Sequence, residues 1–281
     1  MTNRNNETKM RFISTDRNDR WWIEPLWTGL GFLAFVIYTT WAMLQGNYYW
    51  WSSFQEGFGG YLSPFYSPLL FIKQGVEGVA PLSHSWFGSW PEWVPKLIPA
   101  TPAILILAGP LSFRMTCYYY RKFYYRAYFL TPPACAVSGI PQQNYKGETA
   151  LFVFQNLHRY TLYIAIVIIA ILTYDGILSF FRSGEFGVGI GSLILIINPV
   201  LLAGYTFGCH AFRHLVGGNK DCFTCPKGNP TIRYSLWKGV SMLNNRHMFW
   251  AWASMVWVAF SDIYVRMVAS GRWIDLNTWG S

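Results

Sequence analysis

The sequence predicts an all-α integral membrane protein, a single domain built as a bundle of five transmembrane helices. Of its 281 residues, 52% are hydrophobic and only 12% are charged, against about 25% charged in an average soluble domain. The chain also contains 15 Trp and 18 Tyr, whose rings collect at membrane–water interfaces. This composition excludes a water-soluble enzyme, and the aromatic content excludes a disordered chain.

Each predicted helix rests on a run of mostly apolar residues, of which about 20 are needed to cross a bilayer. Before the first run lies a polar arm (1–24), whose first 18 residues lack the apolar core of a cleavable signal peptide. Between the first two runs, the aromatic segment 46–96 is expected to fold as turns over the external end of the bundle. The last two runs are joined by the loop 213–247. The five runs cover residues 25–44, 97–120, 150–175, 187–212 and 248–269.

The distribution of positive charge predicts how the bundle is oriented. Seventeen of the 22 Lys and Arg residues fall on the side that holds the N-terminal arm, the loop between the second and third spans, and the loop 213–247. Because cytoplasmic segments carry the excess of Lys and Arg, we expect a cytoplasmic N-terminus and an external C-terminus. Topology and anionic membrane lipid then explain the basic excess, and no nucleic-acid partner is needed.

Two Cys and four His are predicted to gather at the cytoplasmic end of the bundle. Ionisable residues inside a membrane are costly and mark functional sites. Because successive helices alternate in direction, the end of the second span, the start of the third, the end of the fourth and the start of the fifth meet at one membrane surface. The residues that these ends carry are Cys117, His158, Cys209, His210, His214 and His247.

Three kinds of site fit this set of side chains. Two thiolates with two imidazoles are the ligands of a Rieske-type [2Fe–2S] centre, and equally of a structural zinc site. The third is a bis-His haem b, formed by His158 with His210 or by His214 with His247. Because the ligands come from distant helices, their spacing along the chain does not separate these alternatives.

Other polar residues carry weaker predictions. Arg114 lies one turn inside Cys117, so we expect it to point into the bundle and to need a partner. Cys222 and Cys225 form a lone C-x-x-C in a cytoplasmic loop, where reduced thiols are expected. At the external end the simplest prediction is solvated helix ends, and the alternative is a proton relay or a second quinone site. The residues concerned there are Tyr174, Asp175, Asp262, Tyr264 and Arg266.

Several segments, taken jointly, carry a family resemblance that extends from Arg20 to Leu276. They are Asp-Arg-Trp-Trp at 19–22, Phe-Val-Ile-Tyr at 35–38, Tyr-Leu-Ser-Pro-Phe-Tyr-Ser-Pro at 61–68, Phe-Arg-Met-Thr-Cys-Tyr-Tyr-Tyr-Arg-Lys at 113–122, Gln-Asn-Leu-His-Arg-Tyr at 155–160, Thr-Tyr-Asp at 173–175, Cys-His at 209–210, Arg-His at 213–214, Asn-Arg-His-Met at 245–248 and Val-Ala-Ser-Gly at 268–271. With these segments the sequence resembles the cytochrome b-like membrane-anchor subunits of succinate dehydrogenases (succinate:quinone oxidoreductases), of the haem-free mycobacterial type.

The resemblance implies a role. The chain would hold the iron–sulfur and flavoprotein subunits of succinate dehydrogenase at the cytoplasmic membrane of a prokaryote, and would pass electrons from succinate to quinone. It would not be an enzyme alone, since it has no flavin or dicarboxylate site. A higher oligomer of the complex is a further expectation. Two alternatives stay open: the same role with one haem b, and a structural membrane subunit with zinc or no metal at the Cys/His set.

The resemblance also implies which residues hold the cofactors. An embedded Rieske-type [2Fe–2S] cluster would replace haem, with Cys117 and Cys209 as thiolate ligands and His158 and His247 as imidazole ligands, one from each of four helices. His210 and His214 then lie beside the ligands or on the quinone side. Menaquinone or ubiquinone would bind near the cytoplasmic face. The residues expected to bind it are Arg20, Trp21, Trp22, Tyr118 and Arg121.

Overall fold

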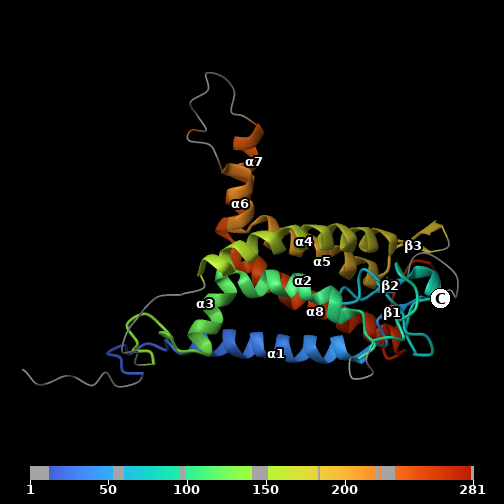
Figure 1. Ribbon diagram of the computed structural model, residues 1–281, viewed down its shortest axis with the longest axis horizontal. Helices are drawn as coiled ribbons and strands as arrows, with labels where there is room; N and C mark the ends of the chain where they lie inside the picture. Colours follow the sequence, from blue (N-terminus) through green and yellow to red (C-terminus); the bar gives the residue numbers. More distant parts are fainter. Residues whose placement is uncertain are drawn as a thin grey trace, which may run out of the picture.

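The computed structural model shows a helical bundle capped at one end by short strands and turns (Figure 1). It describes residues 13–52, 60–94, 99–140, 151–182, 184–218, 222 and 232–279. The predicted all-α class is confirmed, with little sheet in the described residues. The eight α-helices in these residues are α1 (Ile23–Gln45), α2 (Ala103–Thr116), α3 (Tyr118–Ala127), α4 (Leu151–Leu178), α5 (Ile190–Phe207), α6 (His210–Gly217), α7 (Ile232–Asn245) and α8 (His247–Ala269).

Four of these helices are long and apolar enough to cross a membrane, where five were expected. They are α1, α5, α8 and the part of α4 that covers Val153–Leu178. The second predicted span, 97–120, begins partly outside the described residues and is shorter than expected, because α2 has only 14 residues and ends at Thr116. Helix α2 is apolar and packs along α4, so it extends through part of the bundle thickness.

The helices pack closely where small residues let their neighbours approach. Helix α5 packs between α4 and α8. A Cβ atom on Gly204 of α5 would lie 2.5 Å from the ring of Trp250 on α8, so this close approach requires glycine. Large apolar side chains such as Leu30 and Ile37 on α1 are exposed, as expected for surfaces that contact lipid.

The segment after α1 folds over one end of the bundle, as its turn-rich sequence predicted. It contains β1 (Trp50–Trp51), β2 (Tyr61–Leu62) and the short 3-10 helix η1 (Leu82–His84). The Tyr66 hydroxyl donates to the carbonyl of Ala42 at 2.7 Å and so fixes the segment to the end of α1. A second hairpin, β3 (Phe181–Arg182) with β4 (Glu185–Phe186), lies at the same end (Figure 1).

Buried ion pairs stabilise this capped end, which corrects the expectation of solvated helix ends. Asp262 is completely buried and accepts a hydrogen bond from Arg266 Nε at 2.7 Å. Arg182 and Asp275 form a second buried pair at 3.3 Å. Only Tyr174 of the residues expected to be solvated is largely exposed. The expectation was wrong for the others because the loop that folds over the helix ends excludes water from them.

Helices α3, α6 and α7 lie at the opposite end of the bundle, and α6 and α7 pack on each other there. Figure 1 shows α6 and α7 rising across the direction of the spanning helices. The segment 213–247, expected as a loop between spans, therefore contains most of α6 and all of α7. Residues 219–221 and 223–231 of that segment, with Cys225, lie outside the described residues.

Candidate functional site

Both cysteines of the predicted cluster lie at breaks between helices. Cys117 separates α2 from α3 and has an extended backbone, with φ −66° and ψ 134°. Cys209 separates α5 from α6 and has nearly the same conformation, with φ −69° and ψ 146°. Each cysteine is therefore the N-cap residue of the helix that follows, and the amide of Ala211 donates to Cys209 Sγ at 3.4 Å. A helix N-terminus stabilises a thiolate.

Each cysteine lies against one histidine from another helix. His158 of α4 places Nε2 3.0 Å from Cys209 Sγ, and His247 of α8 places Nε2 3.8 Å from Cys117 Sγ. All four side chains are buried. The predicted span 187–212 makes Cys209 and His210 neighbours on one continuous helix. The break at Cys209 turns His210 outward, and both His210 and His214 on α6 are exposed.

The surroundings of His158 suit a metal-binding imidazole. Its Nδ1 atom donates to the carbonyl of Phe113 at 3.1 Å and lies 3.0 Å from the Thr116 hydroxyl. With the proton on Nδ1, the Nε2 lone pair faces Cys209. A histidine that binds a metal typically donates its other N–H to a carbonyl in this way. The His158 ring also stacks on Phe113, with ring centroids 4.4 Å apart.

His247 packs against two aromatic rings, and one of its ring nitrogens makes no hydrogen bond to the described residues. Its ring stacks on Tyr205 at 5.0 Å and contacts Tyr119 at 5.1 Å. Its Nδ1 atom is buried and has no hydrogen-bond partner among the residues that the structure describes. A buried polar atom without a partner is costly, so this side chain is unsatisfied as it stands.

A cavity of about 460 Å³ adjoins the two Cys–His pairs. Tyr118 and Arg121, two of the residues expected to bind quinone, are part of its wall. Arg121 is buried and its guanidinium lies 5.9 Å from the ring of Tyr118, which is mostly exposed. The six predicted Cys and His residues all line the cavity: Cys117, His158, Cys209, His210, His214 and His247.

The other residues expected to bind quinone lie elsewhere. Trp21 and Trp22 line a separate apolar groove of about 340 Å³ between the start of α1 and the end of α3. This groove shares no lining residue with the Cys/His cavity, and Arg20 lines neither of the two. The structure therefore divides the predicted quinone site, because the two tryptophans precede α1 while Tyr118 follows α2.

The arrangement is two pairs and not one four-residue centre. Across the described residues, no group of three or more His, Cys, Asp or Glu side chains is close enough together to hold a single metal ion. A structural zinc ion needs four ligands around one point. A [2Fe–2S] centre divides four ligands between two irons, two to each. The paired arrangement therefore suits a two-iron centre better than a zinc ion.

Burial disfavours the thiolate form of both cysteines. Desolvation raises the pKa of Cys117, and a hydrogen bond from Tyr205 and the amides at the start of α3 oppose that rise. Desolvation also raises the pKa of Cys209 to about 12, while the amides of Ala211 and Phe212 act in the opposite direction. Because metals bind the thiolate, binding here would release protons and become tighter as pH rises.

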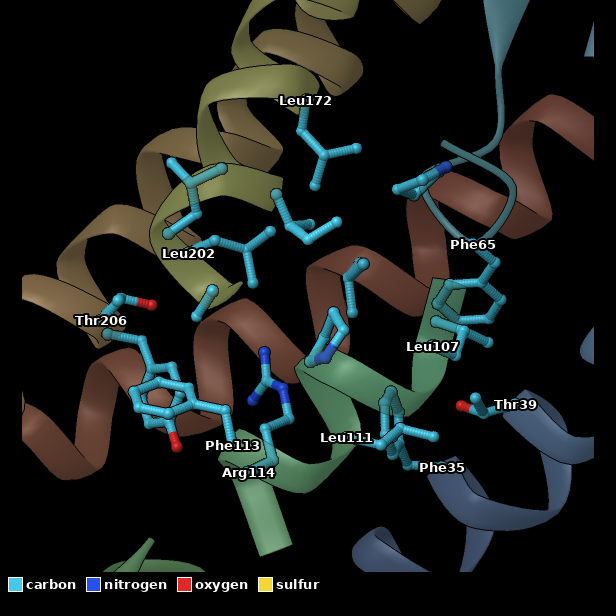
Figure 2. Close-up of a pocket in the computed structure, with 17 residues that line it drawn as sticks. Phe35, Thr39, Phe65, Leu107, Leu111, Phe113, Arg114, Leu172, Leu202 and Thr206 are labelled. Atoms are coloured by element: carbon cyan, nitrogen blue, oxygen red, sulfur yellow. The ribbon is translucent and has the colours of Figure 1, made fainter. Parts of the chain in front are cut away.

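The sequence predicted the inward orientation of Arg114, but not the cavity beside it. Arg114 is buried and points into the bundle, as the sequence predicted. It borders a small internal cavity of about 60 Å³ lined mainly by apolar side chains. Figure 2 shows Arg114 beside Phe113, with Thr206 at one edge of this cavity and Thr39 at the other. Tyr205, which contacts both Arg114 and His247, carries no sequence signal, because it is one aromatic residue in an apolar helix.

The remaining cysteines differ from expectation in one respect. Cys222 is disulfide-bonded, so the prediction of a reduced thiol is wrong at this position. The predicted thiol at Cys225 lies outside the described residues. Cys135 is free and exposed.

Comparisons with known proteins found matches that extend over most of the chain. A family model described as actinobacterial succinate dehydrogenase subunit SdhC matches residues 23–271. A chain of the solved structure "Mycobacterium smegmatis Sdh1 complex in the apo form" is 41% identical, with a TM-score of 0.80. That match covers 95% of this chain and 94% of the other. The search of curated proteins found no match.

Proposed function

Since this chain belongs to the actinobacterial succinate dehydrogenase subunit SdhC family, we propose that it works as the membrane anchor that passes electrons from succinate to quinone. Electrons would reach it from the iron–sulfur subunit, which receives them from the flavoprotein subunit. The chain itself would supply no site for succinate. It would hold a [2Fe–2S] cluster and a quinone, which is menaquinone or ubiquinone.

The observation that carries this proposal is the pair of Cys–His contacts at the end of four helices. Cys209 with His158 and Cys117 with His247 would be the four ligands. When bound, the cluster supplies one-electron transfer. The chain's own residues prepare the site: the two helix N-termini favour thiolates, and the Phe113 carbonyl orients His158. The buried Nδ1 atom of His247 lacks a partner among the described residues, and a bound cluster would give this histidine one.

The same end of the molecule is the proposed docking surface for the other subunits. An electron must travel from the partner's cluster to this one, so the partner has to bind beside the Cys/His pairs. The positive-inside rule places this end in the cytoplasm, where succinate is oxidised. Exposed basic residues at this end are Arg20, Arg159, Lys238 and Arg246.

Quinone is proposed to bind in the Cys/His cavity of about 460 Å³. A quinone headgroup needs flat apolar walls and donors to its carbonyl oxygens. The ring of Tyr118 and the guanidinium of Arg121 offer both beside the electron donor. The exposed His210 and His214 line the same cavity, where their ring nitrogens can form hydrogen bonds with a bound headgroup.

Metal analysis and EPR on the purified complex test the proposal. We expect iron and acid-labile sulfide beyond the content of the other subunits, and a Rieske-like signal after reduction. The substitutions C117S and C209S are expected to remove this signal, while C135S, at an exposed cysteine, is the matched control and is expected to leave it. An active complex without this additional sulfide would refute the proposal. A haem α-band in the reduced-minus-oxidised spectrum would show that the chain binds haem b in place of the cluster.

A second measurement separates the two ways of distributing the ligands. In a Rieske-type centre both histidines bind one iron, whereas in the structure each histidine lies against a cysteine. Pulsed EPR resolves the nitrogens bound to the reduced iron. Two strong nitrogen couplings indicate the Rieske distribution, and one indicates a mixed Cys–His pair on each iron.

A further inference from the structure

Arg114 is a buried cation beside the proposed electron carrier, and no buried anion among the described residues is its partner. Its side chain is 6% exposed. Within the described part of the chain it makes no ion pair. By contrast, Arg182 and Arg266 at the capped end are each paired with a buried aspartate. A guanidinium is always charged, and a charge buried without a counter-charge is destabilising.

Neutral groups hold this guanidinium in one position. It donates to the Tyr120 hydroxyl, to Ser254 Oγ at 2.9 Å and to the Ala251 carbonyl at 3.3 Å. It also lies 4.9 Å from the centre of the Tyr205 ring. These contacts satisfy its hydrogen bonds and fix its orientation, but none of them neutralises its charge.

The guanidinium is connected to the Cys117–His247 pair through one aromatic ring. Tyr205, whose ring it contacts, stacks on His247 with centroids 5.0 Å apart. The amide of Cys117 donates to the carbonyl of Arg114 itself at 3.1 Å. The missing counter-charge is therefore expected at the pairs.

We infer that Arg114 is the fixed counter-charge of the electron-carrying centre, a positioning residue that stabilises the centre's reduced state. The inference rests on the proposed function. Two ferric ions, two sulfides, two thiolates and two neutral imidazoles are neutral overall. Reduction adds one electron from the iron–sulfur subunit, forms and breaks no bond, and leaves one net negative charge. Arg114 attracts that charge across a medium of low dielectric constant.

Substitutions that separate charge from shape test the inference. R114Q removes the charge and R114K keeps it. R126Q is the matched control, since Arg126 is a less buried cation on α3, with a side chain 30% exposed and Glu24 3.9 Å away. Redox titration of the EPR signal is made in membranes that contain the whole complex. Iron and sulfide are measured on the same samples.

We expect R114Q to lower the equilibrium constant for reduction of the centre at least tenfold, which is 59 mV for one electron. R114K and R126Q are expected to change it less than threefold. An R114Q centre that is present with an unshifted potential overturns the inference and leaves the proposed function standing. A native complex without the centre overturns the proposed function itself.

If the R114Q complex assembles no centre, its potential cannot be measured, and R114K becomes the deciding variant. Recovery of the centre in R114K, where a charge is restored without the guanidinium shape, supports the inference. Failure of R114K in the same way assigns Arg114 a packing role and overturns it.

Discussion

Replacing Asp262 by Asn is expected to destabilise the capped end of the bundle. Asp262 is fully buried on α8 and accepts hydrogen bonds from Arg266 Nε at 2.7 Å and from the Tyr38 hydroxyl at 2.5 Å. Ser63 of the covering segment donates to its other oxygen. Asn has nearly the same shape but no charge, so D262N leaves the guanidinium of Arg266 buried without a counter-charge.

The expected loss follows from the geometry of this pair. At 2.7 Å, an effective dielectric constant near 20 gives an attraction of about 6 kcal/mol. Part of it is recovered, because Arg266 still donates to the carbonyls of Asn47 and Ala42, both at 2.9 Å. Breaking one partner of a buried pair typically costs about 3–5 kcal/mol. On the scale of soluble domains this lowers the unfolding temperature by on the order of 10 °C.

The measurement is thermal unfolding of the complex in detergent, followed by tryptophan fluorescence. D19N is the matched control, because Asp19 forms an ion pair with Arg17 in solvent, where ion pairs contribute little. A double variant, D262N with R266M, removes the stranded charge and is expected to recover part of the loss. If D262N unfolds at the temperature of D19N, the buried pair does not stabilise this end and the reasoning is wrong.

Three further predictions concern the stability of the fold, its pH dependence and the response to quinone. Replacing Gly204 by Val forces a Cβ to within 2.5 Å of the Trp250 ring and is expected to cost about 1–3 kcal/mol, whereas Gly239→Ala on α7 meets open space and leaves stability unchanged or slightly higher. Burial raises the pKa of Tyr61 from 10.0 to about 12, so the folded state holds this proton longer than the unfolded chain. Stability should therefore fall as pH rises from 10 to 12, and less steeply in Y61F; equal slopes would contradict this. Arg121→Gln is expected to raise the quinone concentration needed for half-maximal reduction several-fold while the EPR signal persists, and an unchanged quinone response would count against the site.

Much of the candidate site followed from the sequence because a bundle imposes simple geometry. In an antiparallel bundle, the ends of the second and fourth spans and the starts of the third and fifth lie at one surface. The gathering of Cys117, His158, Cys209 and His247 therefore required only the order of the spans. The choice of these two histidines had come from the family resemblance. The structure places both of them against the cysteines and leaves His210 and His214 exposed.

The helix breaks at the cysteines could not be read from the sequence. Neither Cys117 nor Cys209 has a neighbouring proline, although Gly208 precedes Cys209. The structure gives each an extended backbone. Those breaks shortened the predicted spans, and they placed each sulfur at a helix N-terminus. Contacts with residues about 40 to 130 positions away decide such breaks, because local propensity is weak against tertiary packing.

The sequence by itself determined that this chain lies in a membrane, which end holds its thiols and imidazoles, and that Arg114 points inward. Those properties depend on composition and on alternation along the chain. Only the tertiary structure decided which cysteine meets which histidine, that Asp262 and Arg266 pair under the covering segment, and that Arg114 is held by neutral groups. Burial and pairing depend on side chains from several helices at once, so no pattern along one helix can specify them.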